Sequence, residues 1–313
     1  MADALIPHKA CKLAFGLQTG LGVPAAASIM FPINEDTTGP NWGKNYTFFQ
    51  YSDGNYDRRH YYSEGEWAEG DISFPLLPGV LSGDFYDWIL GRSSDATYAQ
   101  GYYATIYRNL GNIIERFVDV KVKSGSLAVP AGMATVKLSV LGLQTPEEVG
   151  AFSGTIYTAK PYTYNEATVE LALGGGSYGV PDAALASETY TSNHTLEFDN
   201  MVEEAKDMIT LRGETTPIAL PNNAKAEWSG NFDRIFANPD IYRDFLNGRE
   251  GQYRLTLTHA TGAVATILMP RIVWTEHAMN VPGSGIVRTS GIPFTALGST
   301  DGTVGACAIT ESL

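Results

Sequence analysis

The sequence has 313 residues, of which 44% are hydrophobic and 18% charged, so it can bury a core and is not an intrinsically disordered chain. Its length fits two average domains or one large β domain, and its 33 Gly, 17 Tyr and 16 Pro favour strands joined by tight turns over helices. The formal charge is −13, and because Lys and Arg form no cluster, the sequence argues against sequence-independent binding of duplex nucleic acid.

The N-terminal segment, residues 1–20, has no charged region followed by an apolar core, so we expect no signal peptide. No apolar run approaches the ~20 residues needed to cross a bilayer, so we expect a soluble protein without a membrane partner. Cys11 and Cys307 lie near opposite ends of the chain, a spacing that suits neither a metal site nor a disulfide framework.

A first set of elements is predicted in the first half of the chain. In order, these are a strand over residues 66–74, a short helix over 84–90, a hairpin of 103–107 with 113–122, and a strand over 135–140. Ser82 suits the N-cap of the helix, because its hydroxyl can accept from a free backbone N–H. Gly91 suits the position after the helix, because glycine adopts a positive φ without strain.

The segment 144–192 is richer in Gly, Ala, Thr and Tyr, and we expect it to be a linker. Two strands, over 153–158 and 167–173, are predicted within it as an inserted hairpin. Gly174, Gly176 and Gly179 then match the Gly-x-Gly-x-x-Gly pattern of dinucleotide sites. Pro181 follows and no long helix can face a pyrophosphate, so we interpret these glycines as a flexible loop.

The second half repeats the plan of the first. Its elements are an opening strand over residues 194–199, a strand over 226–236, a short helix, a hairpin of 253–258 with 263–269, and a final strand over 291–297. The helix is predicted to have Asn238 as its N-cap, Pro239 as its first residue and Gly248 after its end.

Landmarks shared by the two halves favour a tandem duplication over two unrelated β domains with similar turns. They are Asp87-Trp88-Ile89-Leu90-Gly91 with Asp244-Phe245-Leu246-Asn247-Gly248, Glu66-Trp67 with Glu227-Trp228, and Gly101-Tyr102-Tyr103 with Gly251-Gln252-Tyr253. They keep the same order, and Gly248 follows Gly91 by 157 positions. We therefore predict a mainly β protein with a first unit over residues 1–143, a linker over 144–192 and a second unit over 193–313.

No catalytic, cofactor-binding or metal-ligating residues are predicted. The histidines His8, His60, His194, His259 and His277 lack a second His, Cys or carboxylate at a metal-ligand spacing. A Ser-His-Asp triad can be assembled from distant residues, and the sequence leaves that possibility open. We expect a protein that is not an enzyme and has no cofactor.

Aromatic residues gather at Tyr51, Tyr56, Tyr61 and Tyr62, beside several charged residues. Aromatic platforms can bind sugars or proteins, but Tyr is generally enriched at subunit interfaces, so we favour an interface or an ordinary strand. We expect the segments 34–64 and 144–193, which look least like the repeat, to contact other subunits.

The order of these motifs resembles the tail tube proteins of siphophages, in particular a two-unit class of roughly this length. The resemblance rests on Trp228-Ser229-Gly230-Asn231-Phe232, the helix over 239–246, the hairpin over 253–269 and the opening strand, with first-half counterparts at Trp67, Gly70 and Ile72. It covers most of the chain apart from 144–193. The order and duplication of the motifs carry it, since no single motif is specific.

The resemblance implies units built as a β-barrel or sandwich, each with one short flanking helix, and a structural role in the virion. Two units per chain imply a homotrimeric ring of pseudo-sixfold shape, with rings stacked into a tube through which DNA passes into the host. It further implies the tape measure, terminator and tail-tip proteins as partners, only transient and non-specific passage of DNA, location in the phage tail and assembly in the host cytoplasm.

Both halves are acidic, with 11 basic against 16 acidic residues up to Gly150 and 10 against 18 after it, giving −5 and −8. For a DNA conduit we expect a net negative lumen and ring-to-ring faces of mixed sign, although acidic residues on the outside could simply serve solubility. Two alternative functions remain at this point: another tube-forming injection-system or tail protein, and a carbohydrate-binding β-sandwich protein.

Overall fold

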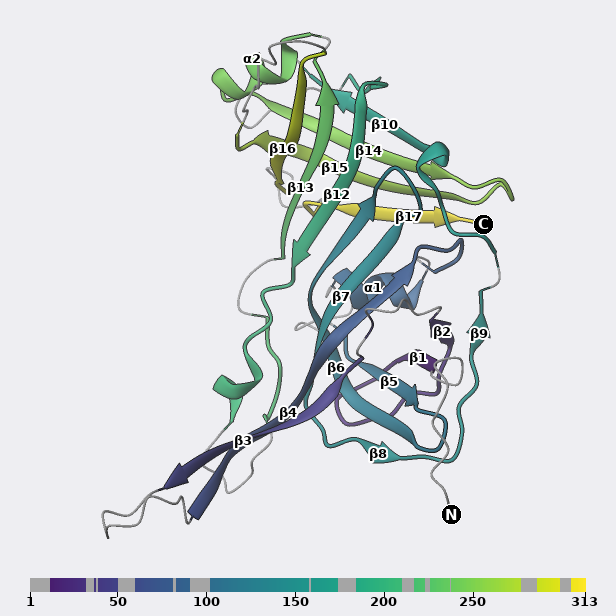
Figure 1. Cartoon of the computed structure of the whole chain (residues 1–313), viewed down its shortest axis with the longest axis vertical. Helices are drawn as coiled ribbons and strands as arrows, with labels where there is room; N and C mark the ends of the chain where they lie inside the picture. Colours follow the sequence, from purple (N-terminus) through teal and green to yellow (C-terminus); the bar gives the residue numbers. More distant parts are fainter. Residues whose placement is uncertain are drawn as a thin grey trace.

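The computed structural model describes residues 12–31, 37, 39–49, 60–80, 83–90, 102–157, 159–173, 184–209, 217–222, 226–236, 238–276, 286–298 and 305–313. These residues form a mainly β structure, as the sequence predicts (Figure 1). Several residues singled out in the sequence lie outside the described part: Cys11, Ser82, Gly91, Gly101, Gly174, Gly176, Gly179, His8, His277, Tyr51 and Tyr56.

The first half of the chain contains nine strands and one α-helix among its described residues. Its elements are β1 (Lys12–Leu17), β2 (Ile29–Phe31), β3 (Asn41–Phe49), β4 (His60–Pro75), α1 (Asp84–Leu90), β5 (Ala104–Asn109), β6 (Ile114–Val129) and β7 (Thr135–Gly142). The two-residue strands β8 (Glu147–Glu148) and β9 (Thr155–Ile156) follow. The predicted helix over 84–90 and the hairpin after it are confirmed.

The second half has a similar succession of elements. They are the 3-10 helix η3 (Tyr164–Glu166), β10 (Ala167–Ala172), β11 (Ala186–Ser187), β12 (Thr191–Asp199), the 3-10 helix η4 (Ala205–Met208), β13 (Glu227–Ile235), α2 (Asp240–Leu246), β14 (Glu250–Thr258), β15 (Val264–Trp274), β16 (Arg288–Ala296) and β17 (Ala308–Ser312).

The strands of the two halves pair in the same order. In the first half the order of antiparallel neighbours is β1, β5, β6, β7, β4 and β3. In the second half it is β10, β14, β15, β16, β13 and β12. Along the chain, α1 connects β4 to β5 and α2 connects β13 to β14. Because β4 matches β13 and β5 matches β14 in the order of pairing, the two helices occupy matching places in the chain.

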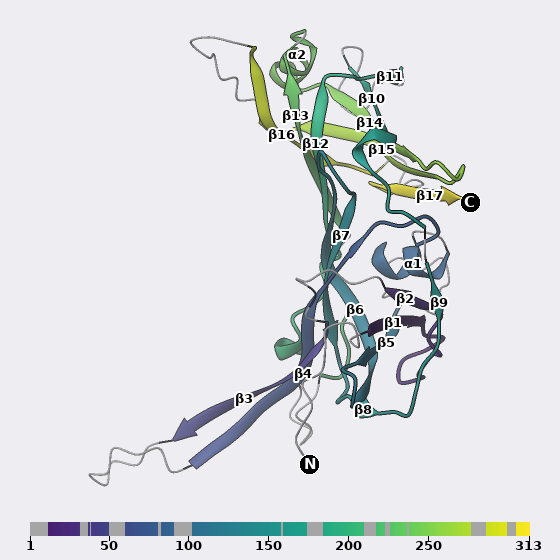
Figure 2. The same ribbon diagram turned by 45° about the vertical axis from the view of Figure 1, so that its right-hand side comes forward.

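One pairing between the halves joins them into a single sheet. Residues 194–199 of β12 run antiparallel to residues 124–129 of β6, with Phe198 opposite Gly125. The long sheet therefore runs without a break through β3, β4, β7, β6, β12, β13 and β16 (Figures 1 and 2).

The strands form because apolar and polar residues alternate along them. In β13 Trp228 and Phe232 point their side chains into the core, Gly230 between them is also buried, and the residues that alternate with these three are more exposed. β14 shows the same period of two, as the sequence predicts for a strand with one buried face. Burial of the apolar set on one side leaves the polar set of each strand on the opposite side.

Aromatic clusters fill the core beneath the sheet. In the first half Trp88 and Phe85 of α1 are fully buried against Phe15, with ring centroids 4.9 and 5.2 Å away. The Trp88 indole donates to the backbone oxygen of Val120 at 2.9 Å, which fixes α1 on β6. In the second half Phe232, Tyr253, Trp274 and Phe294 form the corresponding cluster.

The start of α2 differs by one residue from the sequence prediction. Pro239 is the N-cap and Asp240 the first helical residue, whereas the sequence predicted Asn238 as N-cap and Pro239 as first residue. The Asn238 side-chain oxygen still accepts from the Asp240 backbone N–H at 3.4 Å. At the other end Gly248 has a φ of 59°, which confirms its predicted place after the helix.

The hairpin expected in the segment 144–192 does not form. β9 pairs in parallel with β2, whereas β10 pairs along its whole length with β14 and with β11 at its end. Val169 and Leu171 of β10 are buried in the core, so this strand is part of the second half's sheet. Non-local backbone pairing, which the local sequence pattern does not report, decided its neighbours.

The two Glu-Trp pairs lie in matching strands but not at matching positions. Gly70 is opposite Val140 in the first half, and Gly230 is opposite Phe294 in the second. Counting from these glycines, Trp228 corresponds to Ala68 and Trp67 to Glu227. Trp228 is buried, whereas Trp67 is half-buried on the other face, so equating the two tryptophans was wrong by one residue.

We predict that Gly125→Ala weakens the junction of β6 and β12. A Cβ at this position would lie 2.6 Å from the Phe198 ring and 2.7 Å from the Lys137 backbone oxygen. Overpacking of this kind costs roughly 1–3 kcal/mol. Thermal unfolding of the purified chain measures the loss.

The matched control is Gly132→Ala, because a Cβ at Gly132 meets no atom within 4 Å. It should change the unfolding temperature little. Equal effects of the two substitutions would contradict the close approach of Phe198 to β6.

Candidate functional site

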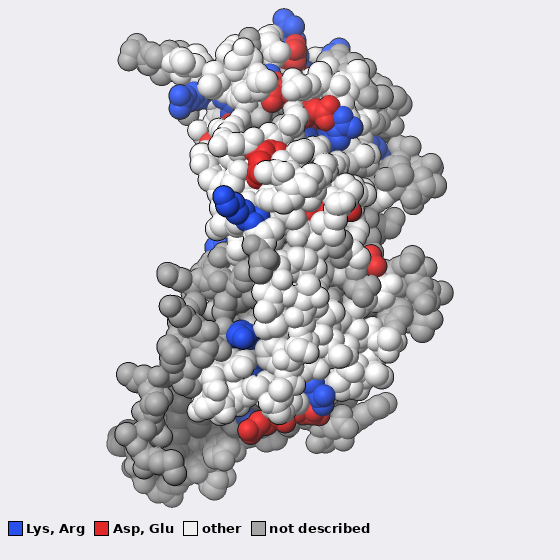
Figure 3. Space-filling model, turned by 90° about the vertical axis from the view of Figure 1, so that its right-hand side faces the viewer, with Lys and Arg blue, Asp and Glu red and all other residues white. Residues whose placement is uncertain are grey.

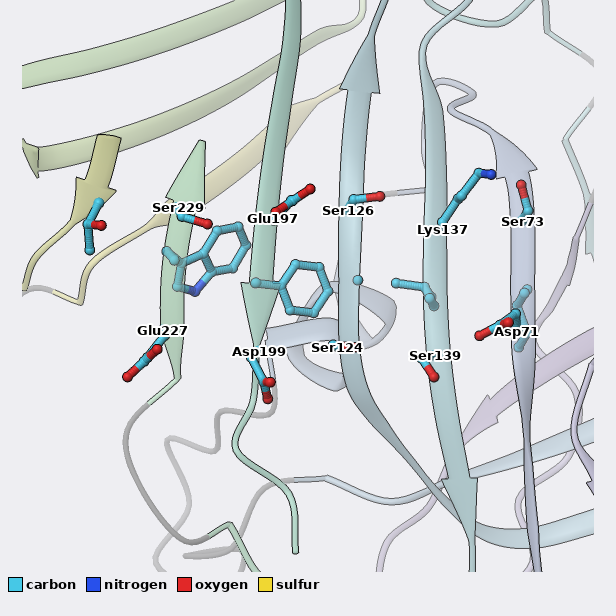
Figure 4. Close-up of a pocket in the computed structure, with 16 residues that line it drawn as sticks. Asp71, Ser73, Ser124, Ser126, Lys137, Ser139, Glu197, Asp199, Glu227 and Ser229 are labelled. Carbon is cyan, nitrogen blue, oxygen red and sulfur yellow. The ribbon is translucent and has the colours of Figure 1, made fainter. Parts of the chain in front are cut away.

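The residues of interest lie on the polar side of the long sheet, where β4, β7, β6, β12 and β13 run side by side (Figure 4). They line an open groove with a volume of about 710 Å³. Its polar members, which we name the polar ladder, are Asp71, Ser73, Ser124, Ser126, Lys137, Ser139, Glu197, Asp199, Glu227, Ser229 and Thr295.

The register of the strands arranges the polar ladder in two rows. The first row consists of direct cross-strand neighbours in the order Asp71, Ser139, Ser124, Asp199 and Glu227. The second row is Ser73, Lys137, Ser126, Glu197, Ser229 and Thr295. Figure 4 shows the two rows crossing the strands one above the other. Both rows pass over the β6–β12 junction, so neither half of the chain contains the site alone.

The polar ladder is net acidic. It holds four carboxylates, Asp71, Glu197, Asp199 and Glu227, against the single ammonium of Lys137, which gives −3. Asp199 lies directly opposite Glu227 in the register. Like charges in this position destabilise a sheet, so folding alone does not account for the pair. The Asp199 carboxylate also accepts from the Met201 backbone N–H at 2.7 Å.

One end of this face is covered by the chain segment between β12 and β13. Val202, Ala205 and Leu220 of that segment pack against Leu141 and Leu143. The Lys121 Nζ donates to the Leu220 backbone oxygen at 2.7 Å and to the Asn222 Oδ1 at 2.9 Å. The Leu220 N–H donates in turn to the Tyr103 hydroxyl at 3.1 Å, so the segment is held by polar bonds as well as apolar contacts.

His194 and His259 contact side chains that hold them in the fold. His194 lies in the core between Thr191 and Tyr253, at 3.1 and 3.0 Å, and stacks on Phe232. Its burial lowers its pKa to about 4, so the ring is neutral at pH 7. His259 contacts the Thr261 hydroxyl at 2.8 Å inside a turn. Within the described part of the chain, no three His, Cys, Asp or Glu side chains are grouped as metal ligands would be.

The sequence predicted no site residues, and it missed the polar ladder. Its signal is the alternation of Ser, Thr, Asp, Glu and Lys with apolar residues in six strands, which only strand order combines into one surface. The Gly-rich segment also holds Gly175-Gly176-Ser177-Tyr178-Gly179, which has the Gly-x-Ser-x-Gly spacing of a nucleophile elbow, so a prediction that the sequence contains no such motif is wrong. That segment and half of the tyrosine cluster lie outside the described residues.

The described residues define a mainly β protein whose sheet carries one long polar surface across both halves of the chain. In a comparison with protein families, the model of a family described as phage tail tube protein matches residues 52–305. The match covers most of the sequence, so the chain belongs to the phage tail tube protein family, and it is a structural component of the virion tail. No curated protein matches the chain. Among the described residues, no helix is long and apolar enough to cross a membrane.

We predict that Lys121 makes stability depend on pH. Burial lowers its pKa to about 8, below the roughly 10.4 of an exposed lysine. The unfolded chain therefore binds more protons between these values, and the free energy of unfolding rises with pH across that window. Relative to Lys121→Met, the wild type should gain about 1–2 kcal/mol between pH 7.5 and 9.5.

Chemical denaturation of both chains at the two pH values measures this difference. An identical pH dependence in the wild type and the variant would show that Lys121 does not carry it.

Proposed function

We propose that copies of this chain join head to tail into closed trimeric rings, and that the rings stack into the tube of the tail. The observation that carries this proposal is the β6–β12 junction, where a strand of one half extends the sheet of the other. Each chain also leaves edges of the same sheet available. Among the described residues, β3 pairs only with β4, and residues 288–292 of β16 pair only with β13. Such edges readily take a strand from another chain.

We further infer that the chain is a tandem duplication with units close to residues 1–143 and 193–313. The matching order of strand pairing in the two halves supports this interpretation. It also suggests that β10, within the segment 144–192, is the first strand of the second unit, since it holds the place next to β14 that β1 holds next to β5. Three chains of two units each would then give a ring of pseudo-sixfold shape.

In this arrangement the polar ladder faces the lumen and DNA passes along it. A surface of carboxylates and serines gives phosphates no cation cluster to bind, so DNA would slide and remain hydrated. A different side of the molecule carries acidic and basic side chains next to one another over the strands of the second half (Figure 3). Mixed signs suit contacts between identical rings, because opposite charges can set the register.

The remaining partners follow from membership of the tail. The tape measure protein would occupy the lumen before DNA does, and terminator and tail-tip proteins would meet the ends of the tube. Assembly would take place in the host cytoplasm. A siphophage tail is the type of tail that the two-unit organisation suggests.

Electron microscopy of the purified chain tests the assembly. We expect hollow rings or tubes whose end-on class averages show six similar lobes, and three chains per ring by mass measurement. A protein that stays monomeric at high concentration and in the presence of tail-tip proteins would refute the proposal, and rings of six chains would refute the stoichiometry.

We predict that the net negative charge of the polar ladder keeps DNA from adhering to the lumen. Glu197→Lys with Glu227→Lys changes the charge of the ladder from −3 to +1, since each substitution adds two. Tubes of this double variant should retain duplex DNA at low salt, in a form protected from nuclease and released as salt rises.

The matched control is Glu148→Lys with Asp240→Lys, on β8 and α2, which makes the same change in net charge away from the ladder. Any DNA that its tubes bind should remain open to nuclease. Equal protection in both variants, or in neither, would contradict a lumen position for the ladder.

A further inference from the structure

The C-terminal strand β17 belongs to the sheet of the second half, yet it also contacts the first half. It pairs with residues 264–268 of β15. The Ile309 backbone N–H donates to the Tyr86 hydroxyl of α1 at 2.8 Å. The side chains of Ile309 and Ile89 of α1 line one small apolar cavity. Figures 1 and 2 show β17 between the sheet of the second half and α1. β17 therefore rests on the helix of the other half.

Glu311 adds a polar contact at the same place. Its Oε1 accepts from the Gly79 backbone N–H at 2.8 Å and from the Tyr162 hydroxyl at 3.0 Å. Burial, and in addition the Glu311 carboxylate, raise the pKa of Tyr162, so its hydroxyl stays protonated and donates. Both bonds go to a carboxylate, which makes them stronger than bonds between neutral groups. We name the contacts of Ile309 and Glu311 with Tyr86, Gly79 and Tyr162 the clasp.

The segments that receive β17 are rigid. The Leu76 N–H donates to the Ala134 backbone oxygen at 2.9 Å, and the Tyr162 N–H donates to the Leu76 oxygen at 2.9 Å. Gly79 has a φ of 92°, a conformation that favours glycine, and a Cβ there would lie 2.6 Å from the Tyr157 ring. The clasp therefore joins the second half to well-held backbone of the first half and of the segment before β10.

The two halves are thus connected at two separate places. One is the β6–β12 pairing within the long sheet, and the other is the clasp, on the side of that sheet that carries α1. A pair of strands alone leaves the angle between its two sheets variable, because paired strands are rotated by roughly 10–35° relative to each other. A second contact away from the pairing removes that freedom.

We propose that the clasp fixes the angle between the two halves and thereby the number of chains that close a ring. The inference rests on the proposed ring of head-to-tail chains. Three chains turn about 120° each and four turn about 90°, so roughly 15° at each of the two junctions per chain separates these rings. That difference is smaller than the spread of about 25° between paired strands. Glu311 is accordingly a positioning residue for assembly.

Glu311→Ala tests the proposal, because it removes the acceptor of the Gly79 N–H and of the Tyr162 hydroxyl. Among assemblies seen end-on by electron microscopy, the share of three-chain rings should fall by about half or more, because the released angle spreads over the range of paired strands. Rings of four chains and open arcs should take their place. Mass measurement of single assemblies counts the chains.

Conservative and control variants separate position from charge and stability. Glu311→Gln loses the same charge but keeps an oxygen that can accept both bonds, so it should restore three-chain rings. Tyr86→Phe removes the acceptor of the Ile309 N–H and should spread the ring sizes in the same direction as Glu311→Ala. The matched control is Thr310→Ala, an exposed neighbour whose side chain points to the opposite side of β17, and it should leave the rings unchanged.

A measurement on the single chain reads the angle below the concentration of assembly. Spin labels on Ile113→Cys and Leu246→Cys, at exposed positions of the first and second half, report the distance between the halves. Cys11→Ser removes one native thiol, and Cys307 is fully buried. The distance distribution should be about 1.5-fold wider in Glu311→Ala than in the wild type or Glu311→Gln, for the same reason. Circular dichroism and a cooperative unfolding transition verify that each variant folds.

The outcomes distinguish this inference from the proposed function. Three-chain rings of the wild type together with unchanged rings or an unchanged distance distribution in Glu311→Ala would overturn the inference and leave the ring intact. Glu311→Gln assemblies as mixed as those of Glu311→Ala would do the same. A wild type that forms no rings would overturn both.

Discussion

The rest of the structure depends on the pairing of β12 with β6. This pairing turns two sets of strands into one sheet, and it brings Asp199 and Glu197 of the second half beside Ser124 and Ser126 of the first. Phe198 can lie flat over β6 because position 125 has no side chain. Backbone hydrogen bonds make the junction strong without requiring a particular set of side chains, so the same geometry can recur between chains.

The polar ladder follows from this sheet and from the period of two in each strand. Apolar residues fill the core on one side, and the other side receives whatever polar residues alternate with them. Here those residues are short hydroxyls and carboxylates, with Asp199 opposite Glu227 in a pair that weakens the sheet slightly. Such a pair suits the proposed lumen wall, which must not bind a polyanion. A binding site would place cations there instead.

The two halves share a plan but not a surface. The first half has its polar side partly covered by the β12–β13 segment, which Lys121 and Leu141 hold in place. In the second half Val273 and Thr295, which are direct neighbours in the register of β15 and β16, are only half-buried. The matching strands of the two halves therefore carry different side chains on the side of the sheet opposite the core.

The sequence by itself determined the class of fold, the order of its elements and the family, because these depend on local signals. Alternation in residues 253–258 and the glycine at position 248 are properties of neighbouring residues, and both were interpreted correctly. The Asp-Trp and Asp-Phe landmarks are local signals as well, and both lie in short helices, as predicted. Tertiary structure decided which strands are neighbours and which face each residue takes. It placed β10 beside β14, put Trp67 on the face opposite that of Trp228, and assembled the polar ladder from six strands. The physical reason is that a strand's own pattern shows that it has two faces, whereas its partners and its register are set by hydrogen bonds to residues far away in the chain.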